Sequence, residues 1–132
     1  MTHPGKQFYP EGVHWDDQIA QGTLPDLLSK AAADYGARAA LEFRDRAVSY
    51  GELEAMVETA AGAFLRAGYG KNASVALFLG NTPDHPVNFF GALKAGARIV
   101  HLSPLDGEIA LSHKLSDSGA RVLVTSNLAA LL

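Results

Sequence analysis

One continuous apolar run, Ser74–Leu79, constrains the fold of this 132-residue chain more than any other stretch. Its length suits a β-strand, and its lack of polar alternation is typical of a strand buried on both faces, as in parallel sheets. Two further strands are predicted at Arg98–Leu102 and Arg121–Thr125, with helical patterns between them. Helices that alternate with such strands predict an α/β fold, a mainly parallel sheet flanked by helices.

The rest of the chain completes this alternation. The predicted elements are, in order, a helix from a Thr23 cap to Gly36, a hairpin of Ala39–Phe43 with Ala47 and Val48, a helix from a Ser49–Glu52 capping box to Gly68, the strand Ser74–Leu79, a helix that starts near Asn81 and stops at Gly96, the strand Arg98–Leu102, a helix over about Glu108–Ser118, the strand Arg121–Thr125, and a last helix capped by Asn127. The second helix should bury one face, made of Tyr50, Leu53, Val57, Ala61, Phe64 and Leu65.

Two segments are predicted. Residues 1–22, rich in Pro, Gly, His and aromatic residues, are expected to form an extended leader, and residues 23–132 an incomplete α/β subdomain. The last residues, SNLAALL, stop inside an apolar segment with no cap, so we expect the chain to be the N-terminal piece of a longer protein. The first residues contain no apolar run and resemble neither a signal peptide nor a membrane anchor.

The triplet Gly-Ala-Arg occurs three times, at Gly36–Arg38, Gly96–Arg98 and Gly119–Arg121. Each copy lies where a predicted helix ends and a strand begins. A glycine there can take the left-handed conformation that ends a helix, and the arginine complements the helix dipole. The triplet is therefore interpreted as three helix ends with left-handed glycines, and not as a repeated binding device.

Composition excludes several classes of function. Eleven basic and 14 acidic residues give a formal charge of −3 without a basic cluster, which argues against a nucleic-acid partner. Cysteine is absent, so neither disulfides nor thiolate chemistry are available, and a cytoplasmic location is expected. The five histidines lack metal-ligand spacing, so no metal site is predicted.

Two motif matches fail on context. Gly68–Ala73 has the pattern G-x-G-x-x-A, but it follows a predicted helix and opens a strand, the reverse of a dinucleotide-binding turn. His101, Ser103 and Asp106 are close in sequence, but no serine lies in a G-x-S-x-G elbow. We interpret them as a strand histidine, a loop serine and a helix-capping aspartate.

The carboxyl ends of the predicted parallel strands are the natural place for a ligand in such a sheet. They carry small polar residues at 80–82, 101–104 and 125–127, and all three segments should meet at one edge. The same residue types are good helix N-caps, and we favour that structural role for them.

Four segments of the chain resemble the AMP-forming adenylating enzymes, and they occur in the order that this family shows. Val48–Leu53 is similar to the first core motif of that family, and Leu93–Ala97 is similar to its second, Leu-Lys-Ala-Gly-x. Ser74–Asn81 resembles the apolar strand between these motifs, and Asp117–Leu123 a segment after them. The resemblance spans about residues 23–127.

Within the family, the long-chain fatty-acid–CoA ligases fit best. Tyr9–Val13 is similar to their leader, and His85–Gly96 resembles a pattern that begins Tyr-Pro-Val and ends Arg-Ala-Gly. Two alternatives stay open: another adenylating enzyme, such as an aryl-CoA ligase or a peptide-synthetase adenylation domain, and a stand-alone non-catalytic binding or assembly module.

The resemblance implies a reaction for the parent enzyme. A fatty-acid carboxylate would attack Mg-bound ATP to give an acyl-adenylate and pyrophosphate, and CoA would then displace AMP. It also implies the rest of the chain as a partner, and leaves self-association and peripheral membrane association of the parent open.

The resemblance implies that the family's lysine-terminated Gly/Ser/Thr loop, ribose-binding aspartate, Thr-Glu segment and C-terminal catalytic lysine would lie beyond Leu132. We therefore assign no catalytic, cofactor-binding or metal-binding residue to this chain, which should be inactive alone. The sequence also departs from the family pattern: Ser103-Pro104 replaces an Asn-Pro pair, and Arg98 and His101 place polar groups in a strand that is usually Val-rich.

Overall fold

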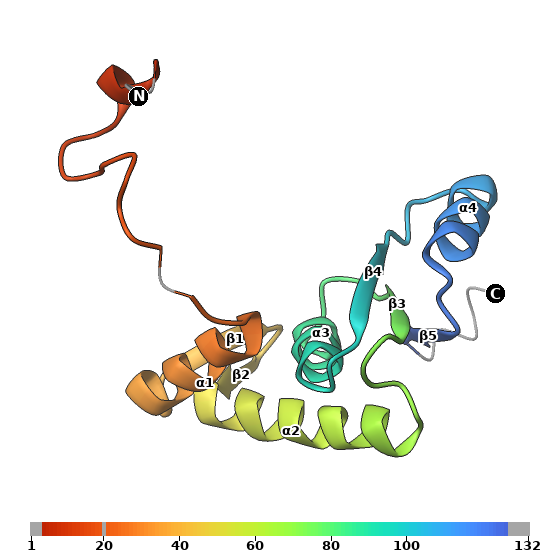
Figure 1. Cartoon of the computed structure of the whole chain (residues 1–132). Helices are drawn as coiled ribbons and strands as arrows, with labels where there is room; N and C mark the ends of the chain where they lie inside the picture. The colour runs from red at the N-terminus through yellow and green to blue at the C-terminus, as the bar shows by residue number, and fades with distance from the viewer. Residues whose placement is uncertain (1–3, 20, 127–132) are drawn as a thin grey trace.

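The structure is a computed structural model that describes residues 4–19 and 21–126 (Figure 1). Its elements are, in chain order, the 3-10 turn η1 (Lys6–Phe8), α1 (Leu24–Tyr35), β1 (Ala39–Phe43), β2 (Arg46–Ser49), α2 (Tyr50–Arg66), β3 (Ser74–Phe78), α3 (Asp84–Lys94), β4 (Arg98–Leu102), α4 (Glu108–Ser118) and β5 (Val122–Thr125). The predicted order of helices and strands is confirmed up to β5. The last predicted helix, with its Asn127 cap, lies outside the described residues.

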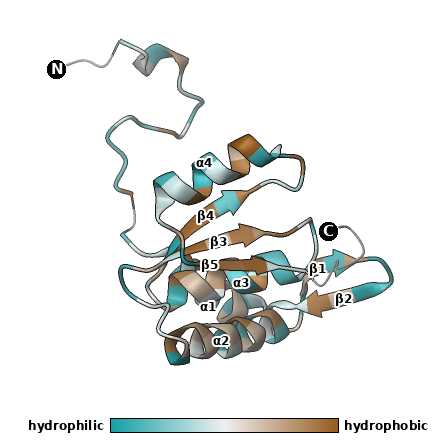
Figure 2. Ribbon diagram, turned by 90° about the vertical axis from the view of Figure 1, so that its right-hand side faces the viewer, coloured by the Kyte–Doolittle hydropathy of each residue, from teal (hydrophilic) through white to brown (hydrophobic). Residues whose placement is uncertain are grey.

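The main sheet is parallel, as predicted, with strand order β4-β3-β5. The central strand β3 is the most buried: Val75, Ala76 and Leu77 have no exposed surface. This matches its unbroken apolar sequence, because each face of a central strand is covered. Figure 2 shows α4 on one side of the sheet and α2 and α3 on the other. β1 and β2 pair separately as an antiparallel hairpin.

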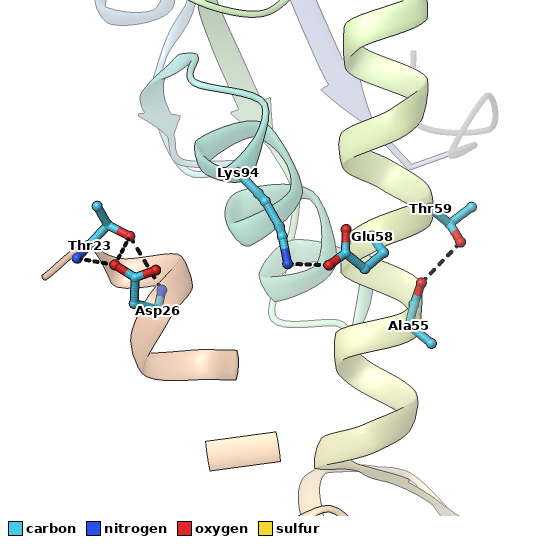
Figure 3. A network of polar contacts seen from close by, with 6 residues as sticks. All are labelled: Thr23, Asp26, Ala55, Glu58, Thr59 and Lys94. Atoms are coloured by element: carbon cyan, nitrogen blue, oxygen red, sulfur yellow. Dashed lines mark hydrogen bonds and ion pairs between the residues drawn. The ribbon is translucent and has the colours of Figure 1, made fainter. Parts of the chain in front are cut away.

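The apolar core falls into two clusters that share the surface of α2. One joins the helices to the sheet and consists of Phe64, Val75, Leu77, Ala92, Ala95 and Ala97. The other joins α1, α2 and α3 and consists of Leu28, Leu53, Val57 and Val87. An ion pair between Lys94 of α3 and Glu58 of α2 lies beside the helix–helix contact (Figure 3). The helix layer therefore links the sheet to the hairpin side of the body.

Both predicted helix starts in the first half of the chain are confirmed. Thr23 caps α1, where its hydroxyl accepts from the Asp26 backbone N–H and the Asp26 carboxylate accepts from the Thr23 N–H (Figure 3). Ser49 and Glu52 make the same reciprocal bonds at the start of α2. Each capping box satisfies two backbone N–H groups that the helix itself cannot pair.

Two predictions about helix ends are wrong. Leu65 was expected on the buried face of α2, but its side chain is 56% exposed, because neighbouring Phe64 takes the inward position in the last turn. Gly36 is right-handed, with φ −45°, whereas Gly96 and Gly119 are left-handed as predicted, with φ 88° and 62°. At Gly36 a close approach explains the glycine instead, because a Cβ would meet the Ala32 carbonyl oxygen at 2.8 Å.

The described part of the leader runs away from the body in Figure 1 and has η1 as its regular element. Within it, the rings of Tyr9 and Trp15 meet edge to face, with centroids 6.2 Å apart. Throughout the described residues, the helices fall short of the length and apolar character that crossing a membrane requires.

Candidate functional site

The three parallel strands end together at one edge of the sheet, as predicted. Phe78, the last residue of β3, pairs in register with Leu102 of β4 and Thr125 of β5. The loops that follow β3 and β4 therefore leave from the same edge, and Ser126 follows β5 there. This carboxyl edge is the candidate functional region of the chain.

The small polar residues at this edge do not cap helices in the described residues, which contradicts the role we favoured. α3 begins after Pro83 and α4 after Gly107, and neither start has a side-chain cap. The Thr82 carbonyl accepts from the His85 backbone N–H, while its hydroxyl donates to the Asp84 carboxylate at 3.5 Å. Backbone bonding in the turn before α3 thus replaces the expected side-chain cap.

Asp106 closes a turn and does not cap α4, which corrects another prediction. Its carboxylate accepts from the Ser103 backbone N–H at 3.0 Å and from the Lys114 ammonium at 2.5 Å. The Ser103 hydroxyl accepts from the Leu105 N–H at 3.1 Å. Lys114 and then the Ser103 N–H hold the pKa of Asp106 below its usual value, since both stabilise the carboxylate. The loop after β4 is therefore fastened to the second turn of α4.

His101 takes no part in that turn, so the structure does not assemble a hydrolase set. Its ring stacks on His85 of α3, with centroids 5.2 Å apart, and on Phe89, at 5.5 Å. His101 stands at an exposed position of β4, and partial desolvation of its ring by these neighbours, and then His85, lower the pKa of His101. No sequence pattern links these two histidines, because they lie 16 positions apart and meet only where α3 packs along β4.

A hollow of about 340 Å³ lies next to this pair, between the β1–β2 hairpin and the start of α3. It is lined by Leu41, Glu42, Phe43, Asn81, Thr82, Pro83, His85 and Pro86. The hairpin residues were not predicted to approach the sheet edge. Their alternating pattern indicated a strand but carried no signal of what it would face.

The structure also locates the Gly68–Ala73 motif and tests for clusters of metal-ligating side chains. Gly68–Ala73 links α2 to β3, which confirms that its context is the reverse of a dinucleotide-binding turn. Gly68 and Asn72 are left-handed in this link, with φ 81° and 70°. In the described residues, no group of three or more His, Asp or Glu side chains is placed to hold a metal ion.

Three of the four segments that resemble the adenylating enzymes lie at junctions between helices and strands. Val48–Leu53 is the junction of β2 and α2 with its capping box, and Leu93–Ala97 is the turn from α3 into β4. Asp117–Leu123 joins α4 to β5. The assignment of no catalytic, cofactor-binding or metal-binding residue to this chain stays a prediction.

Comparison with known sequences connects this scaffold to characterised proteins. The sequence profile of the family described as "AMP-binding enzyme" matches residues 28–131. The chain is 33% identical to a long-chain-fatty-acid–CoA ligase from Yersinia pestis, over 92% of this chain and 22% of the ligase. It is 34% identical to the phosphinothricin tripeptide synthetase PhsC from Streptomyces viridochromogenes, over 83% of this chain and 10% of that synthetase.

Solved structures agree with the fold. The N-terminal subdomain of Klebsiella oxytoca NpsA, in complex with 3-hydroxyanthranilyl-AMSN, superimposes with a TM-score of 0.75 at 25% identity, over 81% of this chain and 28% of that chain. The chain spans about a fifth of the length of the long-chain-fatty-acid–CoA ligases that it matches. The N-terminal subdomain that the resemblance implied is confirmed as a fold.

Proposed function

Because this chain belongs to the AMP-binding enzyme family, we propose that it is the N-terminal part of an ATP-dependent, AMP-forming ligase that joins long-chain fatty acids to CoA. Its own role is to build the helix and sheet scaffold. The parent would form an acyl-adenylate and pyrophosphate from the fatty acid and ATP, and CoA would then release AMP. ATP, Mg and CoA would bind through residues beyond Leu132, where the family's lysine-terminated loop, ribose-binding aspartate and catalytic lysine are expected.

The observation that carries the substrate class is the match to proteins named long-chain-fatty-acid–CoA ligases. It reaches 92% of this chain in the Yersinia pestis ligase and 91% in the Bacillus subtilis ligase, at 33% and 28% identity. This extent supports the resemblance already noted at the leader residues Tyr9–Val13.

A second candidate is an adenylation domain of a peptide synthetase or an aryl-CoA ligase. It is favoured by the 34% identity to PhsC and by the superposition on the NpsA subdomain. These enzymes would share the adenylation step and differ in the acid and in the acceptor thiol. Because both classes share this scaffold, the scaffold does not distinguish which acid the parent enzyme activates.

The experiment is to sequence the reading frame past Leu132, express the complete protein and measure ATP-dependent pyrophosphate release. Palmitate, benzoate and a mixture of amino acids serve as alternative acids, with mass spectrometry of any CoA thioester. Palmitoyl-CoA supports the proposal. Turnover of benzoate or amino acids alone selects the second candidate, and a stop codon after Leu132 leaves a non-catalytic module. Cytoplasmic location, self-association and membrane association stay predictions.

A further inference from the structure

We propose that His85 and His101 form a proton-sensitive pair that holds the first turn of α3 on the carboxyl end of β4 and releases it when the pair is protonated. The pair is a feature of this chain and not of the family pattern that the sequence resembles, because both residues depart from that pattern. That pattern has tyrosine where His85 stands and an apolar strand where His101 stands. The proposal does not depend on which acid the parent activates.

The geometry places three rings in contact across two elements. His101, near the end of β4, stacks on His85 with an interplanar angle of 24° and on Phe89 with an angle of 29°. Phe89 in turn meets Phe90 edge to face at 5.1 Å. Neutral imidazoles suit such a stack, because two charged rings with centroids 5.2 Å apart would repel each other.

The surroundings make a doubly protonated pair unfavourable. His85 is the second residue of α3, where the positive end of the helix dipole opposes a further positive charge. On the other side, β3 presents Leu77 in register with His101, an apolar neighbour that cannot balance an imidazolium. The lowered pKa of His101 agrees with this environment.

Acidic groups near the pair come from three parts of the fold. Asp84 precedes it in α3, and Glu42 of β1 lines the same hollow. Asp106, in the loop after β4, is already paired with Lys114. Two positively charged rings at the distance of this stack would repel each other, so a charge on one ring disfavours a charge on the other.

Release of this stack would change the hollow beside it. His85 lines the hollow together with Asn81 and Glu42, so movement of the first turn of α3 moves one wall. The pair is neutral at high pH. Because the folded-state pKa of His101 is lowered, the unfolded chain takes up more protons below about pH 6.5, and the stabilisation is lost as pH falls through the folded pKa of His101.

The test is an NMR titration of the 132-residue chain between pH 8 and pH 5. The carbon-bound ring protons of each histidine report its pKa, with assignments from single His→Gln variants, and backbone amides of residues 84–90 report the first turns of α3. We expect His101 to titrate below the ordinary value, and the amides of 84–90 to shift with the same midpoint. A His101 that titrates at or above about 6.5 overturns the proposal.

Two variants separate charge from packing. His101→Phe keeps an aromatic ring in the stack but cannot bind a proton, so the amide shifts of 84–90 at that midpoint should disappear. His85→Tyr should raise the pKa of His101, because it removes the positive neighbour. His113→Gln, a histidine of α4, is the control and should change neither result. Amides that titrate equally in His101→Phe and in the unaltered chain contradict the proposal.

Discussion

Gly91 of α3 packs so closely against Ala60 of α2 that a Cβ added to Gly91 would lie 2.7 Å from the Ala60 Cβ. The Lys94–Glu58 ion pair joins the same two helices (Figure 3). This contact sets the distance between α2 and α3, and thus the position of the helix layer under β3 and β4. The glycine lies inside a segment that resembles the adenylating enzymes, so part of that resemblance has a packing cause.

Gly91→Ala should destabilise the chain by about 1–3 kcal/mol, because the added methyl group forces the two helices apart. The higher helix propensity of alanine offsets part of this cost. Urea unfolding followed by circular dichroism measures the change. Gly80→Ala is the control, since nothing lies within 4 Å of a Cβ there and Gly80 is not left-handed. Equal losses in both variants would contradict the close packing.

Ser49→Ala should lower the free energy of unfolding by about 0.5–2 kcal/mol, since it removes the side-chain acceptor that caps α2. The Ser49 hydroxyl accepts from the Glu52 N–H at 3.3 Å. Thermal unfolding of the two proteins gives the difference. Ser112→Ala, at an exposed position inside α4, should be neutral or slightly stabilising, because alanine is the better helix former. A Ser49→Ala chain as stable as this control would exclude the cap.

Arg44→Gly should stabilise the β1–β2 hairpin by about 0.5–1 kcal/mol, because a non-glycine residue is strained in a left-handed conformation. Arg44 has φ 55° in the turn between these strands. Asp45→Gly tests the same turn without that strain and should destabilise it, since glycine adds entropy to the unfolded chain. Denaturation midpoints compare the two. The prediction fails where both substitutions change stability in the same direction.

Asp106→Asn should reduce stability at neutral pH and should flatten the fall in stability at acid pH. The folded-state pKa of Asp106 is lowered by Lys114 and the Ser103 N–H, so its contribution is present above about pH 3.8 and is lost as pH falls through the folded value. Urea midpoints at several pH values between 7 and 2.5 measure this.

Asp117→Asn is the control for this acid dependence. Asp117 is exposed near the carboxyl end of α4, where the helix dipole disfavours a negative charge. Its removal should leave neutral-pH stability unchanged or slightly raised. If the fall in stability at acid pH disappears in Asp117→Asn and persists in Asp106→Asn, it does not come from the Asp106 carboxylate.

Local signals in the sequence determined the elements and their order. β1, β4 and α4 have the predicted bounds, because apolar periodicity and helix-ending glycines act over a few neighbouring residues. The parallel sheet followed from the unbroken apolar run of β3, which only burial on both faces explains. The capping boxes could also be predicted from the sequence, since the two residues of each box are only three positions apart.

Contacts between distant residues were decided by the tertiary structure alone. Leu65 has the same helical pattern as its buried neighbours, but its side chain is 56% exposed in the last turn of α2. Gly36 is required by its approach to the Ala32 carbonyl and not by a left-handed turn. His85 and His101 meet because α3 packs along β4, a contact that no sequence spacing encodes. Periodicity reports which face of an element is apolar, whereas packing decides what that face meets.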